Sequence, residues 1–384
     1  MLSYGRQSID DADLAAVAAV LRGQPLTCGP AVEAFEACVR AVSGAPYAVA
    51  VSNGTSALRL LYQAAGIGPG SRVGVPAITF VATATQAMLL GAEVVLLDVD
   101  PATLLLTPEL LDACGERLDW VVPVHVAGRQ CDLPGIAAVA ARRGIGVLED
   151  AAHAFGSLAG AGPGGCLRHS QGAIFSFHPV KNITTGEGGA ITVRDPAWDA
   201  RLRQLRHHGI VRSGFAGDLA GDHGAPWYHE FHQPATNERM SDVLAALGVS
   251  QCARLDRFRS HRAAVVERYR RELAGLPWLR LPPPAPGQRP FWHLCAAWFD
   301  LPALGLDRRG LFASAAAAGI QLQVHYIPLH HQPVLARARR AGTLAGADRA
   351  YAGLASLPCH AELSDHDQAR VIAWIRSLAP HLRP

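Results

Sequence analysis

The sequence predicts an α/β protein with a large domain built on a mostly parallel sheet and a smaller α/β domain at the C-terminus. Over the first 200 residues, short apolar runs alternate with helical patterns. This alternation is typical of βα units that place helices on both faces of a parallel sheet. A proline-rich segment at 281–287 is expected to form a stiff linker or loop, because repeated prolines cannot pair in a helix or sheet. At roughly 100–200 residues per domain, 384 residues suit two domains.

The first domain is expected to span residues 1–245. Its apolar runs predict strands at 47–51, 73–76, 94–97, 120–124 and 145–148. Helical patterns separate these runs at 55–65, 80–90, 108–116 and 133–143. Two closely spaced strands at 173–177 and 190–193 enclose a glycine-rich loop. These elements together predict the large domain.

The second domain is expected to span residues 246–384. A long helical pattern covers 240–273, and further elements are expected at 291–299, 308–318, 321–327 and 365–378. Helices are expected at 308–318 and 365–378. The pattern therefore indicates a small α/β unit.

Composition excludes several classes of protein. Apolar residues make up 49% and charged residues 17%, which argues against disorder. The arginines of 254–271 are interleaved with Asp256 and Glu267 and followed by Glu272, which favours a solvated helix face over a nucleic-acid patch. With no apolar run near the ~20 residues of a membrane span and no signal pattern at the start, we expect a cytoplasmic protein. Eight scattered cysteines without a C-x-x-C pair predict free thiols and no metal site.

Lys181 is the only lysine among 35 basic residues; the other 34 are arginine. A lysine can lose its proton and act as a nucleophilic amine, whereas a guanidinium stays charged. A primary amine can form a Schiff base with an aldehyde or ketone. The alternative is that one lysine simply survived in an arginine-rich chain, so the neighbouring motifs must decide.

An acid pair and a helix start provide two of those motifs. Glu149-Asp150 ends a predicted strand, where open α/β sheets place ligand contacts. Asp150 can hold a proton on a pyridine nitrogen, although a helix N-cap would explain it as well. The segment 52–58 leads from a strand into a helix whose N-terminus suits a phosphate, or is an ordinary N-cap.

An aromatic ring and a flexible loop complete the set. Phe80 follows another strand end and can stack on a flat heterocycle, unless it only packs in the core. The segment 184–189 is rich in glycine and hydroxyls and can hold Lys181 close to a ligand, unless it is a plain turn. An amine, an acid, an anion site and a stacking ring together predict a site for pyridoxal phosphate.

With these motifs the chain resembles the sugar aminotransferases of the DegT/DnrJ/StrS family, which are fold type I pyridoxal phosphate enzymes. The resemblance runs nearly end to end. It rests on the segments 4–9, 26–30, 52–58, 76–82, 123–125, 149–154, 176–189, 208–210, 237–242 and 325–330. The opening Tyr-Gly-Arg-Gln-Ser-Ile and the segment around Lys181 are most similar to one branch. That branch is the UDP-4-keto-6-deoxy-N-acetylhexosamine 4-aminotransferase of pseudaminic acid biosynthesis.

The resemblance implies a role for each matching residue. Lys181 and Asp150 would be catalytic, with Lys181 joined to the cofactor and then shuttling a proton, and Asp150 paired with the pyridine nitrogen. His153 would lie near the phenolic oxygen, and Phe80 would stack on the ring. Asn237 would reach the phosphate of a neighbouring subunit, which implies a homodimer. The phosphate would be held by Thr55, Ser56 and Ser176, and the nucleotide-sugar pocket lined by Tyr4, Leu26, Thr27, Ser176, His325 and Tyr326.

The resemblance also implies the reaction. A donor, glutamate by family analogy, would give its amino group to the cofactor, which would then aminate C4 of the UDP-linked ketosugar. The alternatives are another nucleotide-linked 3- or 4-ketosugar, and a pyridoxal phosphate-binding regulatory protein that does not turn over.

Two departures stand out. The family's Asn-Tyr-Arg-Met is Asn237-Glu238-Arg239-Met240 here, and the insert 213–232 is expected to reshape the substrate entrance.

Overall fold

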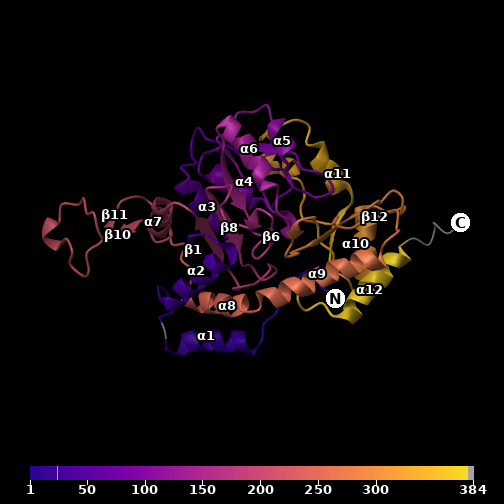
Figure 1. Cartoon of the computed structure of the whole chain (residues 1–384), viewed down its shortest axis with the longest axis horizontal. Helices are drawn as coiled ribbons and strands as arrows, with labels where there is room; N and C mark the ends of the chain where they lie inside the picture. The colour runs from indigo at the N-terminus through magenta and orange to yellow at the C-terminus, as the bar shows by residue number, and fades with distance from the viewer. Residues whose placement is uncertain (24, 379–384) are drawn as a thin grey trace.

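A computed structural model describes residues 1–23 and 25–378 (Figure 1). Its centre is an eight-stranded sheet in the order β1-β9-β8-β5-β4-β2-β3-β15. The strands are β1 (Tyr47–Val51), β2 (Arg72–Pro76), β3 (Glu93–Leu97), β4 (Trp120–Val121), β5 (Gly146–Asp150), β8 (Gly172–Ser176), β9 (Gly189–Val193) and β15 (Arg339–Arg340). Only β9 within this sheet runs against its neighbours. The predicted mostly parallel sheet of an α/β fold is therefore confirmed.

Alternate residues of β1 show why helices cover both faces of the sheet. Val49 and Val51 enter the largest hydrophobic core, which includes the buried face of α3 (Gly54–Ala64). Ala48 and Ala50 point the other way, into a second core shared with α2 (Pro30–Ser43) and α8 (Asp242–Cys252). The period of two along a strand produces this division. The remaining helices of this part are α4 (Ala82–Leu89), α5 (Pro108–Asp112), α6 (Leu133–Arg143) and α7 (Pro196–Leu205).

The C-terminal part has its own core around a three-stranded sheet, β12-β14-β16. Its strands are β12 (Leu279–Arg280), β14 (Cys295–Phe299) and β16 (Leu354–Leu357). The helices α9 (Leu255–Glu272), α10 (Arg308–Ala317) and α12 (Asp365–Ser377) contribute apolar residues to that core. A third small sheet joins β13 (Gln288–Arg289) to β6 (Leu158–Ala159) and β7 (Gly162–Pro163).

The chain after residue 246 is not confined to this second core. β15 pairs in parallel with β3 at the edge of the large sheet, and α11 (Ala345–Gly353) buries Ala347 and Ala350 in the large core. The division at residues 245 and 246 stays a prediction. The segment from the η3 turn (Leu329–His331) to α11 belongs by its contacts to the large sheet.

Several expected elements differ in length or place. The strand expected at 120–124 is continuous only over β4, because Pro123 has no N–H to extend the ladder; beyond it Val124 forms an isolated bridge with Asp150. The helix expected at 108–116 ends as α5 at Asp112, shortly before Gly115. The segment 321–327 forms only an isolated bridge, between Gln323 and Ser356, so β16 supplies the third strand instead.

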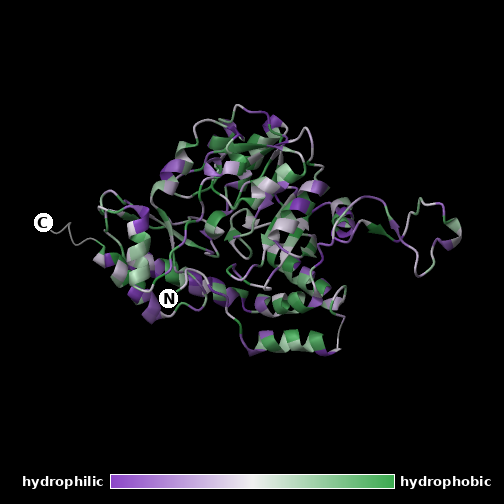
Figure 2. Cartoon of the chain, turned by 180° about the vertical axis from the view of Figure 1, so that it is seen from behind, coloured by the Kyte–Doolittle hydropathy of each residue, from purple (hydrophilic) through white to green (hydrophobic). Residues whose placement is uncertain are grey.

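Two features of the surface lie outside the predicted pattern. The segment between β10 (Ile210–Val211) and β11 (Glu230–Phe231) projects away from the body of the chain (Figure 1). It exposes Leu219, Trp227 and Phe231. The helix α1 (Asp11–Gly23) packs along α8 and is rich in apolar residues (Figure 2). None of the helices in the described part of the chain is long and apolar enough to cross a bilayer.

Candidate active site

A cavity of about 760 Å³ lies where β1, β2, β5 and β8 end. Parallel strands bring their carboxyl ends to one edge, which is where α/β folds place ligands. Its volume lies within the usual range for ligand pockets, about 300–1,000 Å³. Most of the predicted site residues line it: Tyr4, Thr55, Ser56, Phe80, Asp150, His153, Ser176, Lys181, His325 and Tyr326.

Lys181 enters the cavity from the loop between β8 and β9. Its backbone N–H donates to the carbonyl of His178 at 2.9 Å, and its own carbonyl accepts from Arg262 at 3.2 Å. Both bonds involve main-chain atoms of Lys181, so the side-chain amine is free to face the cavity. Burial lowers the pKa of Lys181 to about 8, while the negative charge of Asp150 acts in the opposite direction. A useful fraction of the amine is therefore neutral near neutral pH.

Asp150 ends β5 and is 4% exposed. One carboxylate oxygen accepts from the hydroxyl of Thr83 at 2.7 Å, and the other accepts from the backbone of Ala152 at 3.1 Å. Thr83 lies in α4, and nothing in the sequence pattern marked it. These two bonds hold a buried carboxylate at the cavity, where it can pair with a protonated ring nitrogen.

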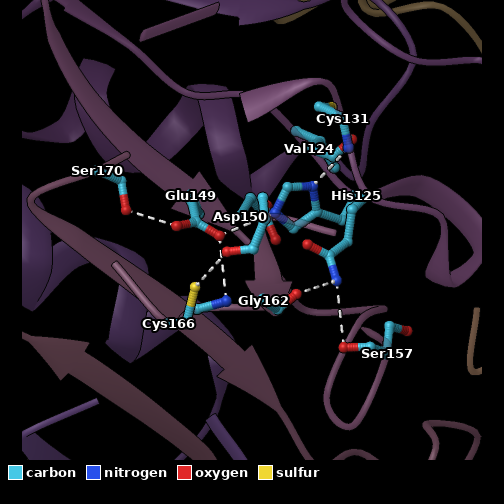
Figure 3. Close-up of polar contacts among 12 residues, drawn as sticks. Val124, His125, Cys131, Glu149, Asp150, Ser157, Gly162, Cys166 and Ser170 are labelled. Carbon is cyan, nitrogen blue, oxygen red and sulfur yellow. Dashed lines mark hydrogen bonds and ion pairs between the residues drawn. The ribbon is translucent and has the colours of Figure 1, made fainter. Parts of the chain in front are cut away.

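Glu149, the other acid of the pair, is not among the residues that line the cavity, and Figure 3 shows its carboxylate within a cluster of polar contacts that includes Ser170. Its carboxylate accepts from the ring of His125 at 2.9 Å, from the backbone of Gly165 at 3.1 Å and from the hydroxyl of Ser170. Successive strand residues face opposite sides, so one acid is structural and the next faces the ligand. The alternation of side chains along β5 therefore places Asp150, and not Glu149, at the cavity.

The start of α3 offers donors for an anion. The side chain of Asn53 caps the helix by accepting from the Ser56 N–H at 2.8 Å. Within the described residues, the backbone N–H groups of Gly54 and Thr55 have no hydrogen-bond partner. A Cβ on Gly54 would lie 2.9 Å from the Cβ of Ser176, so only glycine lets Ser176 approach the helix start. The two N–H groups and nearby hydroxyls form an anion site.

The hydroxyl of Ser56 has another partner. It donates to the carboxylate of Glu238, which also accepts from Ser52 at 3.2 Å and pairs with Arg59. Glu238 is the residue that departs from the family pattern, and it is 8% exposed. The Ser56 hydroxyl is thus engaged by this chain's own acid, and the free donors at the helix start are those of Gly54, Thr55 and Ser176.

His153 and Tyr326 form a directed pair on another wall. The Nδ1 of His153 accepts from the Ala127 N–H at 3.3 Å, so a neutral ring carries its proton on Nε2. Burial and the nearby Lys181 and His325 hold the pKa of His153 well below its usual value, so the ring is neutral. The Nε2–H therefore donates to the Tyr326 hydroxyl, 3.0 Å away. Burial raises the pKa of Tyr326, and its own proton is left to donate into the cavity.

Further histidines adjoin this pair. His293 lies with its ring 4.3 Å from that of His153, lines the cavity and was not predicted. In the sequence it is marked only by its position after Trp292, just before the buried strand β14, and this is too weak a signal to identify a site residue. His325 bonds the hydroxyl of Ser356 at 2.8 Å, and burial lowers the pKa of His325 to about 3. Neutral imidazoles therefore surround the amine.

Three predicted residues lie outside the cavity of their own chain. Leu26, Thr27 and Asn237 do not line it and are exposed. Thr27 forms a bridge with Ser241, four residues after Asn237, whereas Asn237 itself forms a bridge with His207. The insert 213–232 also contributes no cavity residue within the described chain, so its expected effect on the entrance is absent from the single chain.

The residues that line the cavity fit an aldehyde-bearing phosphorylated pyridine. Lys181 offers an amine of lowered pKa, Asp150 a buried carboxylate, and the start of α3 free N–H groups for a phosphate. Phe80 is 54% exposed at the cavity, with its ring 6.0 Å from that of Tyr326. It is placed where a flat ring can stack.

Comparison with known proteins agrees with this geometry. Residues 7–376 match the DegT/DnrJ/EryC1/StrS aminotransferase family. The aminotransferase TlmJ from Streptoalloteichus hindustanus is 31% identical, with a TM-score of 0.89 and coverage of 98% of both chains. The sugar aminotransferase Spr1654 from Streptococcus pneumoniae, in its PLP form, is 25% identical, with a TM-score of 0.86 and coverage of 97% of both. Helicobacter pylori PseC, an aminotransferase of pseudaminic acid biosynthesis, shares the fold at 24% identity, with a TM-score of 0.90 and coverage of 98% of both.

Proposed function

Because this chain belongs to the DegT/DnrJ/EryC1/StrS aminotransferase family and is a pyridoxal phosphate-dependent sugar aminotransferase, we propose a specific reaction for it. It transfers an amino group from glutamate to C4 of a UDP-linked 4-keto-6-deoxy-N-acetylhexosamine. The observation that carries the chemistry is one cavity that holds the chain's only lysine, with its lowered pKa, and a buried aspartate.

Each side chain has a defined task in this proposal. When bound, pyridoxal phosphate supplies the aldehyde that carries the amino group and the ring that takes up electrons. Lys181, neutral for part of the time near pH 7, removes a proton from one carbon and returns it to another. Asp150, held by Thr83, stabilises a proton on the ring nitrogen. Tyr326 donates a hydrogen bond to an oxygen of the ligand, and His153 sets the direction of that bond.

A homodimer is part of the proposal. Leu26, Thr27 and Asn237 were expected at the active site but are exposed on the surface of the single chain. The projecting segment between β10 and β11 exposes Trp227 and Phe231, and α1 exposes Leu14 and Leu21. A second copy that covers these apolar side chains would bring Asn237 to the phosphate site of its neighbour. The cytoplasmic location predicted from the sequence remains part of the same proposal.

The choice of sugar rests on two segments. The opening Tyr-Gly-Arg-Gln-Ser-Ile and the segment 177–189 are those most similar to the pseudaminic acid branch. Another nucleotide-linked 3- or 4-ketosugar is the second candidate. It is supported by the higher identity of this chain to the sugar aminotransferase CalS13 from Micromonospora echinospora, at 28%, than to PseC, at 24%.

The test runs the reaction backwards. UDP-4-amino-4,6-dideoxy-N-acetyl-altrosamine, the expected product, is titrated into the purified cofactor-loaded protein while the visible absorbance of the cofactor is followed. Conversion of the absorbance to that of the amine form of the cofactor supports the proposed sugar. A cofactor that ignores this sugar but responds to glutamate contradicts the sugar while retaining the aminotransferase, and steady-state comparison of other nucleotide sugars then identifies the substrate.

A further inference from the structure

A cluster of metal-ligating side chains lies outside the cavity. His330 and His331 are consecutive in the η3 turn, and Asp348 lies in α11. The Nε2 atoms of the two rings are 2.9 and 2.8 Å from the same oxygen of Asp348. One ligand atom from each residue lies within 4.8 Å of the others. None of the three lines the active-site cavity of the described chain.

We propose that His330, His331 and Asp348 form a site for a divalent transition-metal ion of the zinc type. Two imidazole nitrogens and one carboxylate suit Zn²⁺, Co²⁺, Ni²⁺ or Cu²⁺, whereas Mg²⁺ and Ca²⁺ prefer oxygen ligands alone. Three protein ligands leave one position of a tetrahedral zinc ion for water. His331 and Asp348 are about half exposed, with side-chain exposures of 49% and 47%, so water reaches that position.

The distances are close to those that the ion requires. Bonds of about 2.0–2.2 Å in a tetrahedral site place ligand atoms roughly 3.3 Å apart. The present separations of 2.9 and 2.8 Å from Asp348 would have to open by about 0.5 Å. Rotation of one half-exposed carboxylate allows this change.

Both elements of the cluster are anchored independently. The backbone of Leu329 donates to the carbonyl of Ala77 at 2.8 Å, which fixes the η3 turn at the end of β2. The side chain of Asp98 accepts from Gly346 and Ala347 at 2.8 Å each, which fixes the start of α11. Positioned supports of this kind reduce the cost of organising a metal site.

The buried ring supports the same conclusion. The side chain of His330 is only 3% exposed, and among the described residues its one side-chain hydrogen bond runs from Nε2 to Asp348, into the cluster. A bound ion would join the η3 turn to α11. The turn follows His325 and Tyr326 by a few residues, so the ion would also hold the chain segment that carries two residues of the cavity wall.

The experiment is calorimetric titration of ZnCl₂ into the untagged, cofactor-loaded protein. We expect one Zn²⁺ per chain, and binding at least tenfold weaker in His331→Ala and in Asp348→Asn. The asparagine keeps the shape of the aspartate but not its charge. His366→Ala, an exposed histidine in α12, is the matched control and should bind like the wild type.

X-ray absorption at the zinc edge should show nitrogen and oxygen ligands without sulfur, because no cysteine belongs to the cluster. Absence of binding by the wild type would overturn the proposal and leave a hydrogen-bonded His–His–Asp cluster. Equal binding by Asp348→Asn and the wild type would place the ion elsewhere and overturn it as well. Melting of each variant without metal establishes that it is folded.

Discussion

The single lysine allows the pKa at the centre of the mechanism to be measured directly. If the chain is produced with ¹⁵N in lysine alone, the side-chain amine of Lys181 is the one amine of its kind in the protein. Its nitrogen shift, followed from pH 6 to pH 11 in the cofactor-free protein, should titrate with a midpoint near 8 rather than near the ordinary 10.5.

The magnitude follows from burial. Lowering the pKa of Lys181 from 10.5 to about 8 corresponds to about 3 kcal/mol against the charged amine. At pH 7 it increases the neutral fraction roughly 300-fold, which is what a proton-transfer group requires. The folded state releases its proton before the unfolded chain does. Stability of the cofactor-free protein should therefore rise with pH between about 8 and 10.5.

A matched variant separates the two influences on this group. Asp150 raises the pKa of Lys181 against the effect of burial, so Asp150→Asn should move the midpoint below that of the wild type. A wild-type midpoint near 10.5 would refute the argument, because the amine would then be solvated and almost fully charged at neutral pH. A midpoint in Asp150→Asn that equals or exceeds that of the wild type would contradict the influence of Asp150 on Lys181.

Three further outcomes are expected. Lys181→Arg should keep the fold and the charge but abolish turnover with any amino donor, and steady-state assays that retained activity would contradict the proposed role. Thr83→Val removes a 2.7 Å hydrogen bond to the Asp150 carboxylate, worth about 1.5–3 kcal/mol, so activity should fall roughly 10–100-fold and return in Thr83→Ser. An equal loss in Thr83→Ser would indicate a packing defect instead. Phe155→Ala should lower the free energy of unfolding by about 3–5 kcal/mol, because Phe155 is 2% exposed and packs edge-on against Phe175 and Phe177. A denaturant titration in which the variant loses less than about 1 kcal/mol relative to the wild type would disprove tight packing there.

The sheet was predictable wherever hydrophobic runs had clear ends. β1 begins and ends where expected, and α6 does so too, because Asp132 caps its start and Gly144 its end. The element expected at 321–327 does not form a continuous strand, because Gln323 alone in this segment pairs with another strand, at Ser356. The two N-terminal helices were not predicted, since α1 depends on packing against α8, more than 200 residues away.

At the candidate site, too, the residues in local motifs were predictable and those that depend on distant contacts were not. Lys181 and Asp150 could be found because each belongs to a local motif whose chemistry is specific. Thr83 and His293 could not, because their roles depend on where α4 and β14 are placed relative to β5. Glu238 was noticed as a departure, but only the folded chain shows that its carboxylate engages the Ser56 hydroxyl.

The parallel pairing of β15 with β3 has a consequence for the newly made chain. β3 is an apolar strand, Glu-Val-Val-Leu-Leu, and its outer edge finds its partner only when residues 339 and 340 arrive. During translation, or in any fragment that stops before them, this edge is open to strand addition from other chains. Chains truncated between β14 and β15 should therefore aggregate, although they contain every residue assigned to the cofactor.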